Sequence, residues 1–233
     1  MLIKVNAIEL LEKELPRKRV KGTVGFGSMS DPYTFAERKY GLTRQALEVL
    51  LRHGFPAHLN TKSDLILKDA DLLAEIARVH CSVCFSLSTT DDALARKVEP
   101  FAPPPSARLA AMRALAERGV AVGTCMMPIL PLLEDNPENI HAIVEQTAAH
   151  GGGFIIPWFG MSMRDRQREY YYAELDRHFP GLREKYEKRY GLHYECPANY
   201  ATDLARQFHL RCAELGLETH VRRYQPARQM SLF

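Results

Sequence analysis

From about residue 20 onward, short apolar runs alternate along the chain with longer segments whose apolar positions recur every three or four residues. The short runs predict strands, and the longer segments predict helices with one apolar face. Predicted strands span 20–27, 57–61, 79–88, 120–127 and 153–158. Predicted helices follow them at 41–52, 69–78, from 90 or 91, 106–118 and 137–150. This alternation predicts an α/β fold with a parallel sheet covered by helices.

Residues typical of helix ends support these boundaries. Asp69 stands where it could cap the helix that runs to residue 78. Asn136 is a good cap residue, and the proline after it suits the first helical position. Gly119 follows the helix at 106–118, where a left-handed residue commonly ends a helix.

After about residue 161 the pattern changes, and charged residues and tyrosines dominate. A break at 179–181 interrupts the segment 164–190, and residues 201–215 predict a further amphipathic helix. We therefore expect two parts, a partial β/α barrel at 1–160 and a C-terminal helical appendage at 161–233.

The composition is that of an ordinary globular protein, with 46% hydrophobic and 25% charged residues. A formal net charge of +3 is too small to indicate a nucleic-acid partner by itself. No apolar run reaches the length of a membrane span, and residues 1–18 carry acids where a signal peptide needs an apolar core. We expect a cytoplasmic protein with no membrane partner.

The cysteines are odd in number and scattered, which favours reduced thiols over a disulfide framework. They are Cys81, Cys84, Cys125, Cys196 and Cys212. The first two are three residues apart within a predicted strand and should point to opposite faces. A metal site between them is therefore not expected.

Polar residues follow three successive predicted strands. They are Ser28, Ser30 and Asp31 after the first strand, Lys62 after the second, and Ser86 and Ser88 at the end of the third. The carboxyl ends of parallel strands share one edge of the sheet, where ligands bind. Any one of these residues could instead cap a helix, but together they favour a shared site.

Six short motifs occur in order along nearly the whole chain. They are Phe26-Gly-Ser-Met-Ser-Asp-Pro-Tyr33, Tyr40-Gly-Leu-Thr-Arg44, Thr61-Lys-Ser-Asp64, Phe85-Ser-Leu-Ser-Thr89, Glu99-Pro100 with Arg108, and Met230-Ser-Leu-Phe233. This set resembles the spore photoproduct lyase-like branch of the radical S-adenosylmethionine superfamily. The resemblance implies an incomplete parallel (β/α)₆ TIM-like partial barrel that holds a [4Fe–4S] cluster and S-adenosylmethionine. Reductive cleavage of S-adenosylmethionine would then start radical chemistry on a substrate that the sequence does not identify.

The resemblance also assigns roles to individual residues at the amino acid end of the cofactor. By motif position, Ser28, Ser30 and Asp31 match a segment that meets the methionyl amino group. Lys62 matches a lysine near the cofactor carboxylate, where a point cation is a suitable partner.

Other positions match the segments near the rest of the cofactor. Ser86 and Ser88 match cofactor-facing hydroxyls, and the residues of 83–87 with odd numbers form the apolar face of the same strand. Met127, in the segment 126–131, could flank the adenine ring. Core packing is the alternative interpretation of that methionine.

The chain departs from the family pattern in one respect. The cluster motif of three cysteines, C-x₃-C-x₂-C, should precede Lys4, and the cysteines present have other positions and spacings. A cluster needs thiolate ligands. We therefore expect that this chain lacks the first strand and the cluster loop, because a start was misplaced, the gene is split or the remnant has decayed. Such a chain is expected to be inactive alone, and an upstream polypeptide that carries the motif is a candidate partner.

The alternative is a non-catalytic remnant or a nucleic-acid-binding module. Basic residues and tyrosines are interleaved in 164–190, and such residues can contact phosphates and stack on bases. Acidic residues alternate with them, however, which is typical of a solvated helix.

Overall fold

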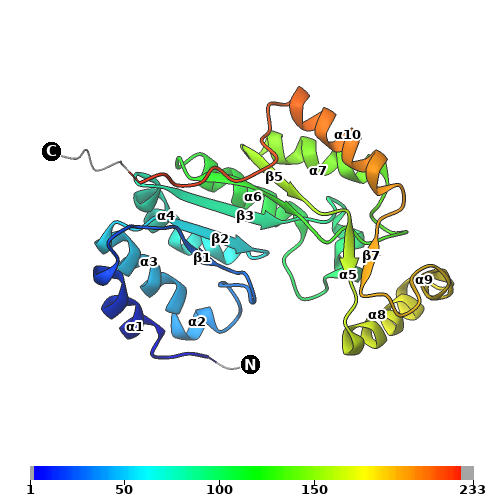
Figure 1. Ribbon diagram of the computed structural model, residues 1–233, viewed down its shortest axis with the longest axis horizontal. Coiled ribbons are helices and arrows are strands. Elements are labelled where there is room, and N and C mark those ends of the chain that lie inside the picture. The colour runs from blue at the N-terminus through cyan, green and yellow to red at the C-terminus, as the bar shows by residue number, and fades with distance from the viewer. Residues whose placement is uncertain (1–2, 227–233) are drawn as a thin grey trace.

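The centre of the computed structural model is a sheet of five parallel strands in chain order (Figure 1). The strands are β1 Val24–Phe26, β2 Ala57–Thr61, β3 Cys81–Ser86, β4 Ala121–Met126 and β5 Phe154–Pro157. The structure describes residues 3–226, so the motif at 230–233 lies outside the described residues. The predicted α/β fold with a parallel sheet is confirmed, and over the described residues the sheet stays open rather than closing into a barrel.

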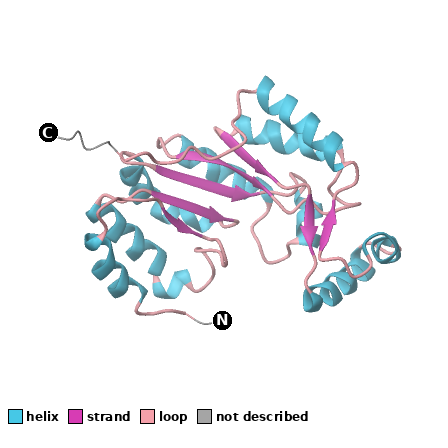
Figure 2. Cartoon of the chain, viewed as in Figure 1, coloured by secondary structure: helices cyan, strands magenta, loops and turns pink. Residues whose placement is uncertain are grey.

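Helices follow the strands as the alternation predicts, and Figure 2 shows them flanking the sheet. They are α3 Leu42–His53, α4 Ala70–Ala77, α5 Asp92–Val98, α6 Pro105–Ala116 and α7 Pro137–Ala149. Asn136 caps α7 as predicted, because its side chain accepts a hydrogen bond from the backbone N–H of Asn139 at 2.9 Å. Asp69 precedes α4 but makes no capping bond. Its carboxylate is instead held by the hydroxyl of Tyr33 and the guanidinium of Arg44.

The amino-terminal region differs from the expectation in two ways. The first strand is shorter than the predicted 20–27, since exposed residues precede Val24 and only three residues pair with β2. Helix α1, Ala7–Glu14, was not predicted from the sequence, and it packs against α3. It is followed by a short 3₁₀ turn at Leu15–Arg17, and the small helix α2, Glu37–Tyr40, precedes α3.

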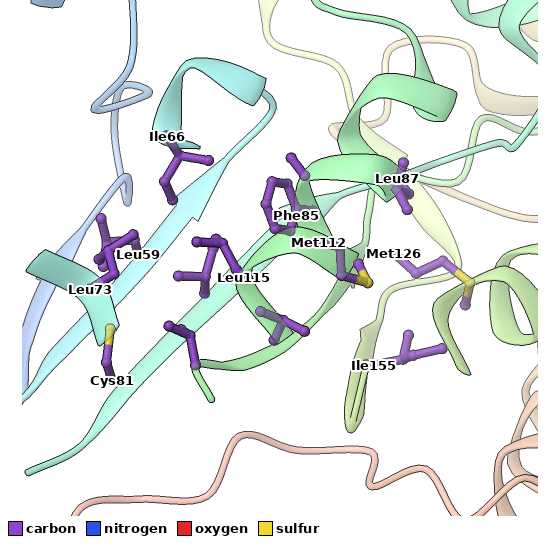
Figure 3. Close-up of a cluster of buried hydrophobic side chains, with 14 of the residues drawn as sticks. Leu59, Ile66, Leu73, Cys81, Phe85, Leu87, Met112, Leu115, Met126 and Ile155 are labelled. Atoms are coloured by element: carbon purple, nitrogen blue, oxygen red, sulfur yellow. The ribbon is translucent and has the colours of Figure 1, made fainter. Parts of the chain in front are cut away.

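One face of the sheet packs against the helices and forms the main hydrophobic core. Side chains alternate along a strand, so Leu59, Phe85 and Ile155 point to this face, where they meet Leu73 of α4 and Met112 of α6 (Figure 3). All five are essentially inaccessible to solvent. Burial of each such side chain stabilises the fold by about 1.5–3 kcal/mol.

The other face of the sheet is more polar. Its side chains are those that alternate with the core positions, and they include His58 and Asn60 of β2, and Ser82, Cys84 and Ser86 of β3. Cys81 belongs to the hydrophobic core, so it and Cys84 lie on opposite faces of β3 as predicted.

A second, smaller cluster lies beyond the sheet. It contains the antiparallel strands β6 Gly160–Ser162 and β7 Glu195–Pro197 and the helices α8 Asp165–His178 and α9 Leu182–Tyr190. Tyr172, Tyr186 and Tyr190 are buried there, and Arg168 donates to the carbonyl oxygens of residues 191 and 193 at 2.6 Å each.

Helix α10, Ala201–Glu214, returns to the main sheet and packs against α7 (Figure 1). Its Phe208 and Cys212 belong to the main core. The segment after it pairs with β5 through Phe154 and Glu218. The division of the chain at residue 161 stays a prediction.

Candidate functional site

A cavity of about 830 Å³ opens at the carboxyl ends of the strands. The loops after β1, β2, β3 and β4 all contribute to its wall. Three residues predicted from the sequence line it, namely Asp31, Lys62 and Ser88. The parallel sheet thus brings side chains from three separate strand ends to one cavity, at the edge of the sheet where ligands bind in open α/β folds.

Asp31 ties the loop after β1 to the end of β2. Its carboxylate accepts hydrogen bonds from the backbone N–H of Tyr33 at 2.8 Å, from the hydroxyl of Thr61 at 2.7 Å, and from the backbone N–H of Lys62 at 2.7 Å. These bonds occupy part of its acceptor capacity and fix its orientation. An ionised carboxylate has about four acceptor positions, so one remains for a ligand.

Lys62 is part of a charged row that crosses the cavity wall. Its ammonium lies 2.5 Å from one carboxylate oxygen of Glu99, whose other oxygen accepts from Arg108 at 2.7 Å. Burial alone would raise the pKa of Glu99, but the two cations hold that pKa below its usual value. Glu99 therefore stays ionised and positions the Lys62 ammonium at the cavity.

Arg108 anchors this row from inside the protein. Its side chain is 1% exposed. The guanidinium also donates to the carbonyl oxygen of Pro103 at 2.7 Å and to that of Ser86 at 2.8 Å. It thereby connects the cavity loop at 100–103 to the end of β3.

Ser88 belongs to a second buried polar group. Its hydroxyl donates to Glu134 at 2.8 Å, and the other carboxylate oxygen of Glu134 accepts from the backbone N–H of Leu130 at 2.8 Å. Asn139 completes the group by donating to the backbone oxygens of Ser88 and Glu134. Burial raises the pKa of Glu134 to about 8. A carboxyl group that titrates near neutral pH thus lies directly behind a residue of the cavity wall.

The remaining predicted residues do not line this cavity. Ser28 and Ser30 are exposed in the loop after β1. Ser86 is half-buried, and its backbone oxygen is taken by Arg108. Met127 is half-buried and directly precedes Pro128, which does line the cavity.

Two acidic residues at the site, Glu99 and Glu134, are not among the site residues that the sequence predicts. Glu99 belongs to the Glu99-Pro100 motif, but it follows a predicted helix and not a predicted strand, so its position along the chain does not mark it as a strand-end residue. Glu134 lies between an apolar run and the helix cap Asn136. A carboxylate there usually faces solvent, so only its burial in the structure reveals its role.

Three large aromatic side chains surround the cavity mouth. Phe35, Phe101 and Tyr170 all line it, and they are 80%, 96% and 61% exposed. Exposed aromatic rings at the rim of a cavity are typical of a binding surface for a ligand with apolar or planar parts.

The described residues do not fit an iron–sulfur cluster. Across residues 3–226, no group of three or more histidine, cysteine, aspartate or glutamate side chains is placed to hold a metal ion. Cys81 and Cys84 are buried on opposite faces of β3.

Among residues 3–226, no helix combines the length and the apolar character that a membrane span requires.

Relatives of this chain are found by sequence, although no known protein-family model matches it. An uncharacterised protein of Mycobacterium tuberculosis is 33% identical over 202 residues, which cover 86% of this chain and 59% of that protein. An uncharacterised protein of Acidianus two-tailed virus is 34% identical over 176 residues, which cover 74% of this chain and 56% of that protein. The chain therefore spans less than two thirds of the length of these relatives.

A solved structure with a similar fold is a spore photoproduct lyase variant with bound AdoMet and dinucleoside spore photoproduct. It matches this chain with a TM-score of 0.66, and the match covers 95% of this chain and 68% of that one. Sequence identity is 14%, so the likeness concerns the fold alone. The expected resemblance is thus confirmed at that level: this chain has the parallel α/β fold of a spore photoproduct lyase.

Proposed function

We propose that this chain is the core and C-terminal part of a radical S-adenosylmethionine protein and that its strand-end cavity binds S-adenosylmethionine. One observation carries the proposal. Asp31, Lys62 and Ser88 follow three different strands, were predicted from motif positions, and line the same cavity. Its volume of about 830 Å³ lies within the roughly 300–1,000 Å³ of small-molecule sites.

Each of the three residues suits one part of this ligand. Lys62 offers a positive charge to the methionyl carboxylate, and its ammonium has two N–H donors left after Glu99 takes one. The acceptor position left on Asp31 suits the methionyl ammonium. The Ser88 hydroxyl can accept from a ligand while it donates to Glu134. The other predicted contacts do not line the cavity and would have to move toward a bound ligand. They are Ser28, Ser30, Ser86 and Met127.

S-adenosylmethionine, when reductively cleaved, supplies a carbon radical that abstracts hydrogen from a substrate. The described residues hold no ligand set for the [4Fe–4S] cluster that would deliver the electron. We propose that a separate polypeptide segment provides the cluster cysteines and that this chain alone is inactive. Its free thiols suit a reducing compartment such as the cytoplasm.

Calorimetric titration of the chain with S-adenosylmethionine tests the binding site. We expect Lys62→Met to weaken binding by roughly 1.5–3 kcal/mol, the scale of a hydrogen bond to a charged group. The matched control is Lys188→Met, because Lys188 is exposed on α9, outside the cavity wall. A decarboxylated S-adenosylmethionine should bind both variants and the wild type alike. Equal loss of both ligands in Lys62→Met, or no loss of either, would contradict the assignment of Lys62 to the carboxylate.

A second candidate function is nucleic-acid binding, which the exposed rings of Phe35, Phe101 and Tyr170 favour. Stacking of one base on an aromatic side chain contributes about 1–3 kcal/mol. A fluorescent single-stranded oligonucleotide should then bind at low salt, and Phe101→Ala should weaken it more than Tyr200→Ala does. Tyr200 is 81% exposed and does not line the cavity, so equal effects would reject the cavity mouth as the binding surface.

A further inference from the structure

A second cavity, of about 1050 Å³, lies toward the amino ends of the strands, and we name it the amino-end cavity. Its floor is the polar face of the sheet, where Gly25, His58 and Ser82 are register partners on β1, β2 and β3. A Cβ added at Gly25 would meet no atom within 4 Å, so the space above this floor is open. Among the described residues, the amino-end cavity and the strand-end cavity share no lining residue, and the two are therefore separate sites in the fold.

The outer wall of the amino-end cavity is the segment 219–225, which follows α10. Its start is fixed to β5, because the backbone N–H of Ile155 donates to the carbonyl oxygen of Glu218 at 2.8 Å. From there the segment, red in Figure 1, runs back beside the sheet toward the amino ends of the strands. Near its far end the ring of Tyr224 lies 6.0 Å from the ring of His80, centroid to centroid. The segment thus contacts the sheet region at both ends, and the cavity lies between them.

The charged side chains of this cavity are all basic. Arg222 and Arg223 line it, and no aspartate or glutamate of the described residues does. The floor adds no charge that opposes them, because burial lowers the pKa of His58, and its ring is hydrogen-bonded to the hydroxyl of Ser82 at 2.8 Å. A cavity with two positive charges and no negative charge attracts an anion.

Both arginines have donors available for such an anion. Arg222 is 83% exposed at its side chain and lies 3.7 Å from Glu218, which does not line the amino-end cavity. A pair this long and this exposed contributes little. Arg223 makes no ion pair within the described residues. Each guanidinium presents five N–H donors in a planar fork that fits the oxygens of a phosphate group.

We propose that the amino-end cavity binds a diphosphate group, either as free diphosphate or as part of a nucleotide. Two guanidinium forks suit the several oxygens of a diphosphate, and the imidazoles of His80 and His220 line the cavity as further donors. The volume leaves room beyond the phosphates, and the ring of Tyr224 offers a surface on which a base can stack. The site does not rest on the proposed cofactor function, because S-adenosylmethionine carries no phosphate.

Calorimetric titration of the full chain with inorganic pyrophosphate tests the proposal. We expect one pyrophosphate per chain with a dissociation constant below about 1 mM. Arg222→Met and Arg223→Met should each weaken binding roughly 10-fold or more, the scale of a hydrogen bond to a charged group. Both residues are exposed, so the variants should fold, which circular dichroism checks. The matched control is Arg206→Met, because Arg206 is exposed on α10 outside the cavity and makes a similar long pair with Asp203 at 3.8 Å.

Titration with ADP distinguishes the two sources of the diphosphate. Tighter binding of ADP than of pyrophosphate, with the difference lost in Tyr224→Ala, would assign the site to a nucleotide, and equal affinities would assign it to free diphosphate. The proposal would be overturned by the absence of saturable pyrophosphate binding, or by arginine variants that bind as well as Arg206→Met. Displacement of pyrophosphate by S-adenosylmethionine would also overturn it, because the anion would then occupy the strand-end cavity. Failure of S-adenosylmethionine to bind at all would reject the proposed function and leave this site intact.

Discussion

Replacement of Glu134 by glutamine tests how a buried carboxyl group controls stability near neutral pH. Glu134 is 0% exposed, and burial raises its pKa from the ordinary 4.5 to about 8. The native state therefore keeps the proton between these two pH values while the unfolded chain has released it. Since the native state binds more protons in this window, stability falls as pH rises.

The expected magnitude follows from the size of the shift. Each pH unit between about 4.5 and about 8 removes about 1.4 kcal/mol from the free energy of unfolding. From pH 5.5 to pH 7.5 the wild type should lose about 2.7 kcal/mol through this group. Glu134→Gln has no proton to lose, and its amide can accept from Leu130 while it donates to Ser88. Its stability should fall by correspondingly less over the same interval.

Urea unfolding followed by circular dichroism at both pH values measures this difference. The control is Glu169→Gln, because Glu169 is exposed on α8 and should leave the wild-type pH dependence unchanged. Parallel stability–pH curves for wild type and Glu134→Gln would refute the reasoning. They would mean that Glu134 is ionised in the native state throughout this range.

Two further substitutions test the packing around the site. Arg108→Met leaves the carboxylate of Glu99 without its buried partner and should lower the free energy of unfolding by about 3–5 kcal/mol, measured in urea, whereas a loss below 1 kcal/mol would contradict the anchoring role. Gly123→Ala places a methyl group 2.3 Å from the carbonyl oxygen of Phe154 and should cost about 1–3 kcal/mol in the same assay. The control is Gly181→Ala, where the added methyl group meets no atom within 4 Å, although its left-handed backbone adds about 1 kcal/mol of strain.

The parts of the fold that follow from local patterns could be predicted from the sequence. Strand β2 has the predicted bounds because its side chains alternate between core and solvent, and α7 begins where Asn136 and a proline indicate. Strands β6 and β7 have three residues each, too few for periodicity to identify. Their pairing joins segments more than thirty residues apart.

For the candidate site too, only residues marked by local sequence patterns could be predicted. Lys62 could be found because it directly follows a strand, and strand ends meet at one edge. Glu99 and Glu134 reach their positions through contacts between segments far apart in the sequence, with Lys62 and Ser88 respectively. Asp69 illustrates the converse, since tertiary contacts with Arg44 override the local capping preference.

The three hydrogen bonds that Asp31 accepts have a consequence for the energetics of any ligand in the cavity. One of them orders the loop after β1 internally, and the other two join that loop to the end of β2 during folding, before a ligand arrives. The entropy lost in ordering these two segments is thus part of folding and does not oppose association. Such preorganisation increases affinity without a new contact, and it favours ligands that match the existing geometry over those that need the loop to move.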